Sequence, residues 1–139
     1  MVALACAAAL TVSQGQAFAA ADWRLPSGPP VSPGGTVSFY LKVTCGEGPC
    51  SYSSSFLLVA RALNGAHFDT SENTSFDLVK NSNQARVGSC QLEEYRVICQ
   101  AAGSGSVDTG DGLVSAQSVT GIAPSGAGTP GFSFSWSDS

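Results

Sequence analysis

Cysteines are the residues of this chain with the clearest capacity for chemistry, and four of the five fall into two pairs. Cys45 and Cys50 enclose four residues in "CGEGPC", and Cys90 and Cys99 enclose eight in "CQLEEYRVIC". Zinc sites built from four thiolates prefer two closely spaced pairs of the C-x2–4-C type, and the second pair is too widely spaced. Cys90 and Cys99 instead lie near opposite ends of a strand–turn–strand unit, where sulfurs on neighbouring strands can reach bonding distance. We predict two local disulfides, Cys45–Cys50 and Cys90–Cys99; crossed pairing and a metal site are the alternatives.

The N-terminal segment predicts export, and export favours disulfides. Residues 2–12 form an apolar run, and small residues follow at Ala17 and Ala19, a spacing typical of a signal peptide cleaved after Ala19. Cleavage removes Cys6 and leaves four of the five cysteines, an even number that indicates two disulfides in an exported chain. The apolar run is too short to span a bilayer. We therefore expect a secreted or cell-surface protein that does not span the membrane.

Catalytic candidates are few. His67 is the one histidine, and it lies beside Phe68 and Asp69 in "AHFDT". A Ser-His-Asp triad could use Asp69 and one of many serines, but the G-x-S-x-G sequence that presents a nucleophilic serine is absent. Two carboxylates could also support glycoside hydrolysis, although the sequence fixes no separation between any two of them. The acidic candidates are Asp69, Glu72, Asp77, Glu93 and Glu94. We predict that the chain has no catalytic residues and is not an enzyme.

Metal and cofactor sites are not indicated either. Asp108 and Asp111 in "DTGDG" place two carboxylates in a glycine-rich loop, which makes them a weak calcium candidate. The loop lacks the alternating ligands and the closing glutamate of an EF-hand, so we favour an Asp/Gly turn between strands. We predict no metal and no cofactor.

Three aromatic residues are weak candidates for binding. Tyr40 falls on the outer face of a predicted strand, and Trp23 and Tyr52 fall in segments that look like loops. An aromatic platform of this kind could stack on sugar rings, whereas the aromatic residues of "FSFSWS" are expected to fill the core. In addition, Asn73 begins an N-x-S/T sequon, which matters only in a eukaryotic source.

Composition limits the class of protein. The chain has 139 residues, 12% of them charged and 43% hydrophobic, with a formal net charge of −4. Six basic residues are scattered along the sequence, so no basic stripe is available to follow a phosphate backbone and we expect no nucleic-acid partner. The length suits one small domain.

The elements that would position these residues are predicted to be strands. "TVSFYLKVTC", residues 36–45, alternates strictly between apolar and polar residues, which predicts a half-buried antiparallel strand. "SFLLVARAL" is nearly continuous in apolar residues and predicts a buried strand that ends at an Asn-Gly turn. Further strands are expected in "AHFDTS", "SFDLV", "QARVGSC", "EYRVICQ", "LVSAQSV" and "FSFSWS", with a turn near Glu93 and Glu94. Seven to eight short strands with turns between them predict an all-β fold, a single antiparallel β-sandwich.

Four stretches of the chain resemble the immunoglobulin-like conserved repeat domains of bacterial surface and cell-wall proteins. They are "VSPGGTVSFYLKVTC", "LLVARALNGAHFDTS", "CQLEEYRVIC" and "SVDTGDGLVSAQSV", and the similarity as a whole covers roughly residues 30–136. The chain departs from that pattern at "CGEGPC", where Cys45 replaces the usual asparagine, and at "ALNGA", which lacks the usual proline. The resemblance implies an Ig-like sandwich with a structural or adhesive role outside the cell, and it supplies no catalytic residues.

These observations give one expected organisation. Residues 1–19 form the signal peptide, residues 20–35 a Pro/Gly-rich lead-in, and residues 36–139 the Ig-like domain. The expected function is a non-enzymatic structural, adhesive or binding module whose partner is an unidentified protein or glycan at the cell surface. A carbohydrate-binding module is the first alternative, and a small secreted hydrolase or inhibitor is the second.

Overall fold

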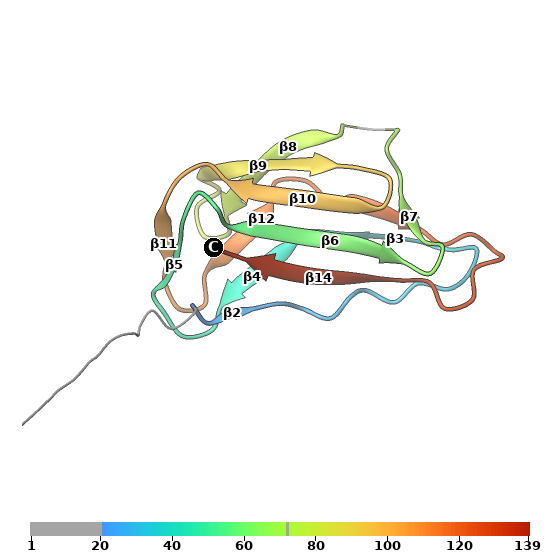
Figure 1. Ribbon diagram of the computed structural model, residues 1–139, viewed down its shortest axis with the longest axis horizontal. Helices are drawn as coiled ribbons and strands as arrows, with labels where there is room; N and C mark the ends of the chain where they lie inside the picture. Colours follow the sequence, from blue (N-terminus) through green and yellow to red (C-terminus); the bar gives the residue numbers. More distant parts are fainter. Residues whose placement is uncertain (1–20, 72) are drawn as a thin grey trace, which may run out of the picture.

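Regular structure is entirely β in a computed structural model that describes residues 21–71 and 73–139 (Figure 1). The predicted signal peptide, residues 1–19, lies outside the described residues. Within the described part of the chain, no helix is long and apolar enough to cross a membrane. The strands are β2 (Trp23–Arg24), β3 (Thr36–Phe39), β4 (Lys42–Cys45), β5 (Cys50–Tyr52), β6 (Leu57–Leu63), β7 (His67–Phe68), β8 (Ser75–Lys80), β9 (Arg86–Leu92), β10 (Arg96–Ala101), β11 (Gly105–Val107), β12 (Gly112–Ser115), β13 (Val119–Ile122) and β14 (Gly131–Ser137).

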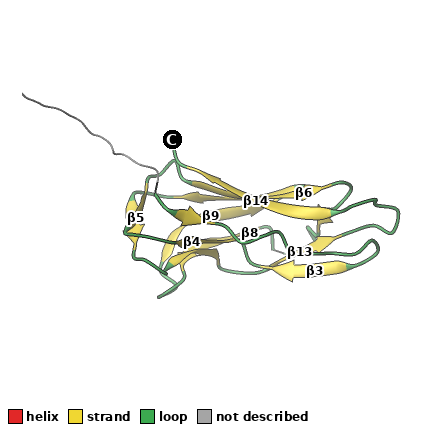
Figure 2. Ribbon diagram, turned by 90° about the horizontal axis from the view of Figure 1, so that it is seen from below, coloured by secondary structure: helices red, strands yellow, loops and turns green. Residues whose placement is uncertain are grey.

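Most strands belong to one large antiparallel sheet. Its eight strands follow the order β14-β6-β10-β9-β8-β12-β4-β2, and the sheet curls so that its two halves face each other. Figure 2 shows the resulting layers from the side, with β6 and β14 in one layer and β3, β4 and β13 in the other. A three-stranded sheet, β3-β13-β7, extends the second layer, and β11 pairs with β5. The prediction of an all-β antiparallel fold is confirmed.

The core lies between the layers and is built by the inward-facing side of each alternating strand. Aromatic rings fill much of it: Phe39 lies 5.4 Å from Phe132 between ring centroids, and Phe56 stacks on Trp136 at 6.0 Å. Burying rings of this size contributes much of the hydrophobic stabilisation of a small domain. Other fully buried side chains include Leu41, Val43, Leu58, Phe68, Leu78, Val97, Leu113 and Val119.

The strand predicted over residues 36–45 is divided between two sheets. β3 pairs with β13 in the three-stranded sheet, whereas β4 pairs with β12 in the large sheet. The strand predicted in "LVSAQSV" divides in the same way, because β12 ends at Ser115 and β13 begins at Val119. The alternation of residues 36–45 runs through the first break, since each sheet requires one buried face. This division, together with the short strands β2, β5, β7 and β11, gives more strands than the seven to eight expected.

Ser115 joins the two divided strands at their breaks. The Leu41 N–H donates to Ser115 Oγ at 3.1 Å, and the Ser115 N–H donates to the Leu41 carbonyl at 2.9 Å. The Ser115 hydroxyl in turn donates to the carbonyl of Gln117 at 2.9 Å. Ser115 is only 1% exposed, so these bonds satisfy backbone groups that water does not reach.

The Pro/Gly-rich lead-in packs against the domain. β2 pairs with β4 at the end of the large sheet, and the side chains of Leu25 and Val31 pack against the core. Between them the chain runs beside β14 (Figure 1), where a Cβ on Gly28 would lie 1.7 Å from the Phe132 carbonyl oxygen. This approach requires glycine. The segment covers an outer edge of β14, which would otherwise be free to pair with another strand.

Candidate functional site

Both predicted disulfides are present, and both are buried. Cys90 and Cys99 lie directly opposite each other on β9 and β10, with their Cα atoms 4.0 Å apart. The turn between these strands includes a hydrogen bond from the Glu93 N–H to the Arg96 carbonyl, so the predicted hairpin forms where expected. The four half-cystines are at most 3% exposed, and all of them belong to the core cluster. These sulfurs stabilise the fold and are not available as metal ligands.

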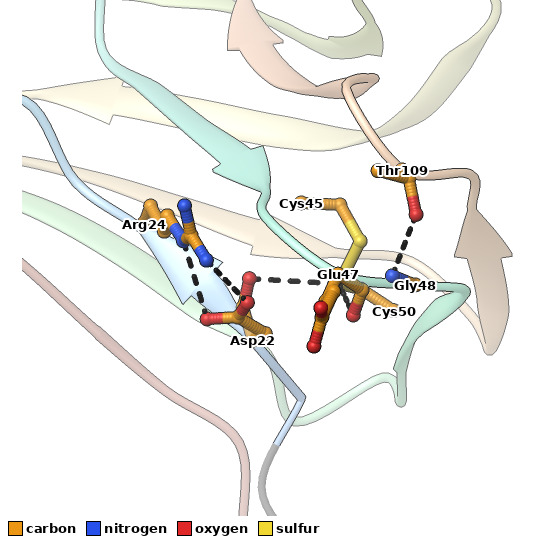
Figure 3. A network of polar contacts seen from close by, with 7 residues as sticks. All are labelled: Asp22, Arg24, Cys45, Glu47, Gly48, Cys50 and Thr109. Carbon is orange, nitrogen blue, oxygen red and sulfur yellow. Dashed lines mark hydrogen bonds and ion pairs between the residues drawn. A yellow bond between two sulfur atoms is a disulfide. The ribbon is translucent and has the colours of Figure 1, made fainter.

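The Cys45–Cys50 disulfide closes the loop between β4 and β5 (Figure 3). Neighbouring segments fix this loop: the Gly48 N–H donates to Thr109 Oγ1 at 2.7 Å, and the Gly46 N–H donates to the Asp22 carbonyl at 2.8 Å. Asp22 also forms an exposed ion pair with Arg24 at 2.9 Å. Figure 3 shows the Asp22–Arg24 ion pair on one side of the disulfide and the Gly48–Thr109 hydrogen bond on the other.

The serine that contacts Asp69 bonds to its carboxylate and not to His67. His67 lies half-buried on β7, two residues before Asp69. The Ser71 hydroxyl and N–H donate to Asp69 Oδ1 at 2.6 and 2.9 Å, and these bonds hold the pKa of the carboxyl below its usual range, with a smaller contribution from His67. The serine proton is therefore directed to the aspartate, and no hydroxyl in the described residues is hydrogen-bonded to the imidazole.

Two other candidate carboxylates form ion pairs with arginines. Asp77 pairs with Arg86 at 3.1 Å on neighbouring strands, and Glu93 pairs with Arg96 at 2.8 Å across the turn of the β9–β10 hairpin. Glu72 lies outside the described residues. Both of these ion pairs are exposed, and the Glu94 carbonyl accepts a hydrogen bond from the Phe68 N–H at 2.7 Å, which places the turn beside the segment that carries Asp69.

The calcium candidate forms a turn. The Asp111 N–H donates to the Asp108 carbonyl at 3.0 Å, as in an Asp/Gly turn. Burial opposes ionisation of Asp111, but bonds from the Ser82 hydroxyl, the Gly112 N–H and the Ser82 N–H, together with the charge of Lys80, lower the pKa of its carboxyl. Asp111 thereby links the β8–β9 turn to the start of β12. Among the described residues, no group of three or more His, Cys, Asp or Glu could hold a metal ion.

Two of the three aromatic binding candidates are buried, which corrects the expectation that they lie in open loops. Trp23 is 6% exposed and packs on Phe56 at 5.4 Å between ring centroids, because its segment forms β2. Tyr52 is 7% exposed on β5, and this burial raises the pKa of its hydroxyl. Tyr40 alone of the three is exposed, at 53%. Phe132 is buried, as expected for a core residue, and Phe134 and Trp136 are partly buried against the core.

Tyr40 borders a hollow that the sequence did not reveal. This hollow, the Tyr40 groove, has a volume of about 320 Å³ and lies on the outer side of β4 and β12, next to the turn between β8 and β9. Its lining includes Tyr40, Lys42, Asn81, Gln84, Val114 and Ala116. The outward position of Tyr40 and Lys42 in the alternating pattern was the available signal. Asn81 and Gln84 come from a turn whose position relative to β4 depends on the fold.

A second hollow of about 450 Å³ lies over β8, β9 and β10, and its lining includes Ser75, Asp77, Ser89, Gln91, Ile98 and Gln100. Phe76 also lines it, but this ring is partly buried against the core, whereas Tyr40 is 53% exposed. The Ser75 hydroxyl donates to Gln91 Oε1 at 3.2 Å, so part of its polar lining is already paired. We therefore consider the Tyr40 groove the better candidate for a binding site.

No protein-family model, curated protein or solved structure matches this chain.

Proposed function

We propose that this chain is an exported, non-enzymatic Ig-like module with a structural, adhesive or binding role at the cell surface or in the extracellular space. The observation that carries the proposal is the pair of buried intramolecular disulfides. Disulfides of this kind persist in oxidising compartments and are rare in the reducing cytosol. Together with the leader-like sequence of residues 1–19, they support a role outside the cytoplasm.

The strand order supports an Ig-like arrangement with two departures. If β4, β6, β8, β9, β10, β12 and β14 correspond to strands A to G, the observed order is G-B-E-D-C-F-A. A constant-type immunoglobulin domain has A beside B and G beside F. The inner neighbours B-E-D and C-F are therefore the same, and the first and last strands have exchanged places. The β8–β9 hairpin also joins the two layers into one continuous sheet.

The contacts of the polar residues support a module that holds or binds rather than catalyses. Asp69, Asp77, Glu93 and Asp111 each bind a neighbouring group of the same chain. Catalytic sites usually bring titratable groups together in a cleft and shift their pKa values there. Here the contacts of these four carboxylates stabilise turns and strand pairs. The carbohydrate-binding alternative loses the row of aromatic rings on "FSFSWS", since those rings pack against the core.

Export and thiol state can be tested together. The full chain is produced in cells with an intact secretion route, and cytosol, surface and medium are separated. Each fraction is then treated with iodoacetamide, with and without reductant, before peptide mass spectrometry. We expect the protein at the surface or in the medium, with all four core cysteines alkylated only after reduction.

The matched control lacks residues 1–19 and should remain in the cytosol. Retention of the full chain in the cytosol with reactive Cys90 and Cys99 would contradict the proposal. Hydrolytic activity of the purified protein that disappears in the His67→Ala variant would contradict its non-enzymatic part.

A further inference from the structure

We propose that the Tyr40 groove binds a pyranose unit of a glycan. The inference rests on the proposed surface role and names the class of ligand for it. The groove provides three components of sugar recognition: an exposed aromatic ring, side-chain amides and one ammonium group. Its volume of about 320 Å³ lies at the lower end of the range of small-molecule pockets, roughly 300–1,000 Å³.

Tyr40 supplies the stacking surface. Its position at the break between β3 and β4 directs it outward, and it remains 53% exposed while Trp23 and Tyr52 are buried. One face of a pyranose ring presents C–H bonds, which pack on the negative face of an aromatic ring. Tyrosine suits this role because it combines a large apolar ring with a polar hydroxyl at its tip.

Asn81 and Gln84 supply donors and acceptors for sugar hydroxyls. The Asn81 amide offers two N–H groups and a carbonyl oxygen, and the Gln84 amide offers a carbonyl oxygen and the one N–H that it does not donate to the Asn81 carbonyl. The turn that carries them is well fixed: the Asn81 N–H donates to the Gly112 carbonyl at 2.9 Å, and the Gln84 N–H donates to the Lys80 carbonyl at 2.8 Å. Because the turn is anchored to β12, the amides are held beside the groove before a ligand arrives, which reduces the ordering cost of binding.

Gln84 has an unusual backbone conformation for its type. Its φ is 60°, in the left-handed region where glycine or asparagine is usually found. Strained residues of this kind concentrate at ligand-binding positions, where the side chain has a use that offsets the cost. The Gln84 amide donates to the Asn81 carbonyl at 3.2 Å, which places it against the groove wall.

The composition of the groove favours a sugar over other ligands. Val114 is almost completely buried, so the exposed apolar surface is mainly the single Tyr40 ring, which is too small for the core of a protein interface. Lys42 is the one cation in the lining of this acidic protein, which does not suit a nucleic-acid backbone. Lys42 can bind either a sugar hydroxyl or the carboxylate of an acidic sugar.

The test uses the mature, disulfide-bonded protein labelled with ¹⁵N. Three probes are titrated separately by NMR and calorimetry: a β-1,4-linked glucose hexasaccharide, an N-acetylglucosamine hexasaccharide and an oligogalacturonate. We expect at least one probe to shift amide resonances of residues 40–42, 81–85 and 114–116. Preference for the oligogalacturonate would assign Lys42 to a carboxylate, and preference for a neutral probe would assign it to hydroxyls.

Three variants separate the groove from general surface effects. Tyr40→Ala should weaken binding at least tenfold, since the pyranose ring loses the aromatic ring on which it stacks. Tyr95→Ala is the matched control: Tyr95 is 60% exposed on the β9–β10 turn, and its removal should leave the Kd unchanged within twofold. Gln84→Gly relieves the backbone at φ 60° while removing the amide, so weaker binding in this variant cannot be attributed to unfolding.

The proposal is overturned if none of the probes shifts groove resonances at millimolar concentration, or if Tyr40→Ala and Tyr95→Ala weaken binding equally. That failure would be distinguishable from failure of the proposed function, because export and thiol state are measured independently of any sugar. If the protein is exported and its cysteines are oxidised but it binds none of the three probes, only the glycan proposal is contradicted.

Discussion

Two pairs of neighbouring strands in this protein are held together in different ways. The β9–β10 hairpin has a continuous ladder from Leu92↔Val97 to Gly88↔Ala101, and a disulfide joins opposite residues within it. It lies between β8 and β6, so both of its outer edges are paired. The pair formed by β3–β4 and β12–β13 is instead interrupted at the same level in both strands, and the hydrogen bonds of Ser115 span the interruption.

The difference shows what a strand pair requires when it changes sheets. A continuous ladder satisfies its own backbone groups, so a covalent link can add stability by constraining the unfolded chain. An interrupted ladder leaves backbone donors and acceptors buried without partners, and a side chain must then provide the missing hydrogen-bond partners. Cys90–Cys99 and Ser115 are therefore both buried at the centre of a strand pair, but they act on different states of the protein.

The comparison is tested most strongly by removing the disulfide of the hairpin. The Cys90→Ala/Cys99→Ala variant should lower the free energy of unfolding by about 2–4 kcal/mol, since the unfolded chain regains the freedom of a closed loop. Equilibrium unfolding in urea, followed by intrinsic fluorescence, measures this loss. Gln91→Ala is the matched control, because Gln91 lies beside Cys90 but faces outward, and its change should stay within about 0.5 kcal/mol. A loss below about 1 kcal/mol in the double variant would break the comparison.

The hairpin was also the part of the fold most accessible from the sequence. Its cysteine spacing, its charged turn and the alternation on both sides all describe one local unit, and local units carry their own signals. The interrupted pair could not be found in this way. The alternation of residues 36–45 continues through the break, because Phe39 and Leu41 both face the core. Phe39 is the last residue of β3, whereas Leu41 lies between β3 and β4.

The candidate site shows the same limit. The outward position of Tyr40 followed from the alternation of its strand, and Tyr40 is exposed. Trp23 was misplaced because its proline-rich surroundings resemble a loop, whereas long-range pairing with β4 draws it into the core. Asn81 and Gln84 carried no signal, since their position beside Tyr40 arises from the pairing of β12 with both β4 and β8.

A second, smaller effect is expected at the interrupted pair. Ser115→Ala removes the acceptor of the Leu41 N–H, which would then lie unsatisfied in the interior, and the donor to the partly buried Gln117 carbonyl. We expect a loss of about 1–3 kcal/mol, the cost of burying unpaired polar groups. Urea unfolding measures the loss, and hydrogen exchange of the Leu41 amide should accelerate in the folded state.

The control for this variant is Ser38→Ala on β3. Ser38 is exposed and its hydroxyl lies 3.2 Å from that of Thr120, so its removal should change stability by less than about 0.5 kcal/mol. If Ser115→Ala were as mild as Ser38→Ala, the breaks in the two strands would not depend on a buried side chain.

The smallest effect concerns the other end of the β4–β12 pair, where Asp111 binds the β8–β9 turn. Asp111→Asn should lower the free energy of unfolding by less than about 1 kcal/mol at neutral pH, because asparagine retains one acceptor oxygen for the Ser82 and Gly112 N–H groups but loses the charge. Asp108→Asn, in the same loop, is the matched control and should be neutral.

The pH dependence gives this prediction its sign. The pKa of Asp111 is lower in the folded protein than the ordinary aspartate value of about 3.9, so its ionised form stabilises the fold fully above that value. As the pH falls through the folded pKa, the carboxylate is protonated and this contribution disappears. The difference between the native protein and Asp111→Asn should therefore be constant above about pH 5 and shrink below about pH 4. A difference that stays constant down to about pH 2 would mean that the shape of the Asp111 side chain, and not its charge, holds the turn against β12.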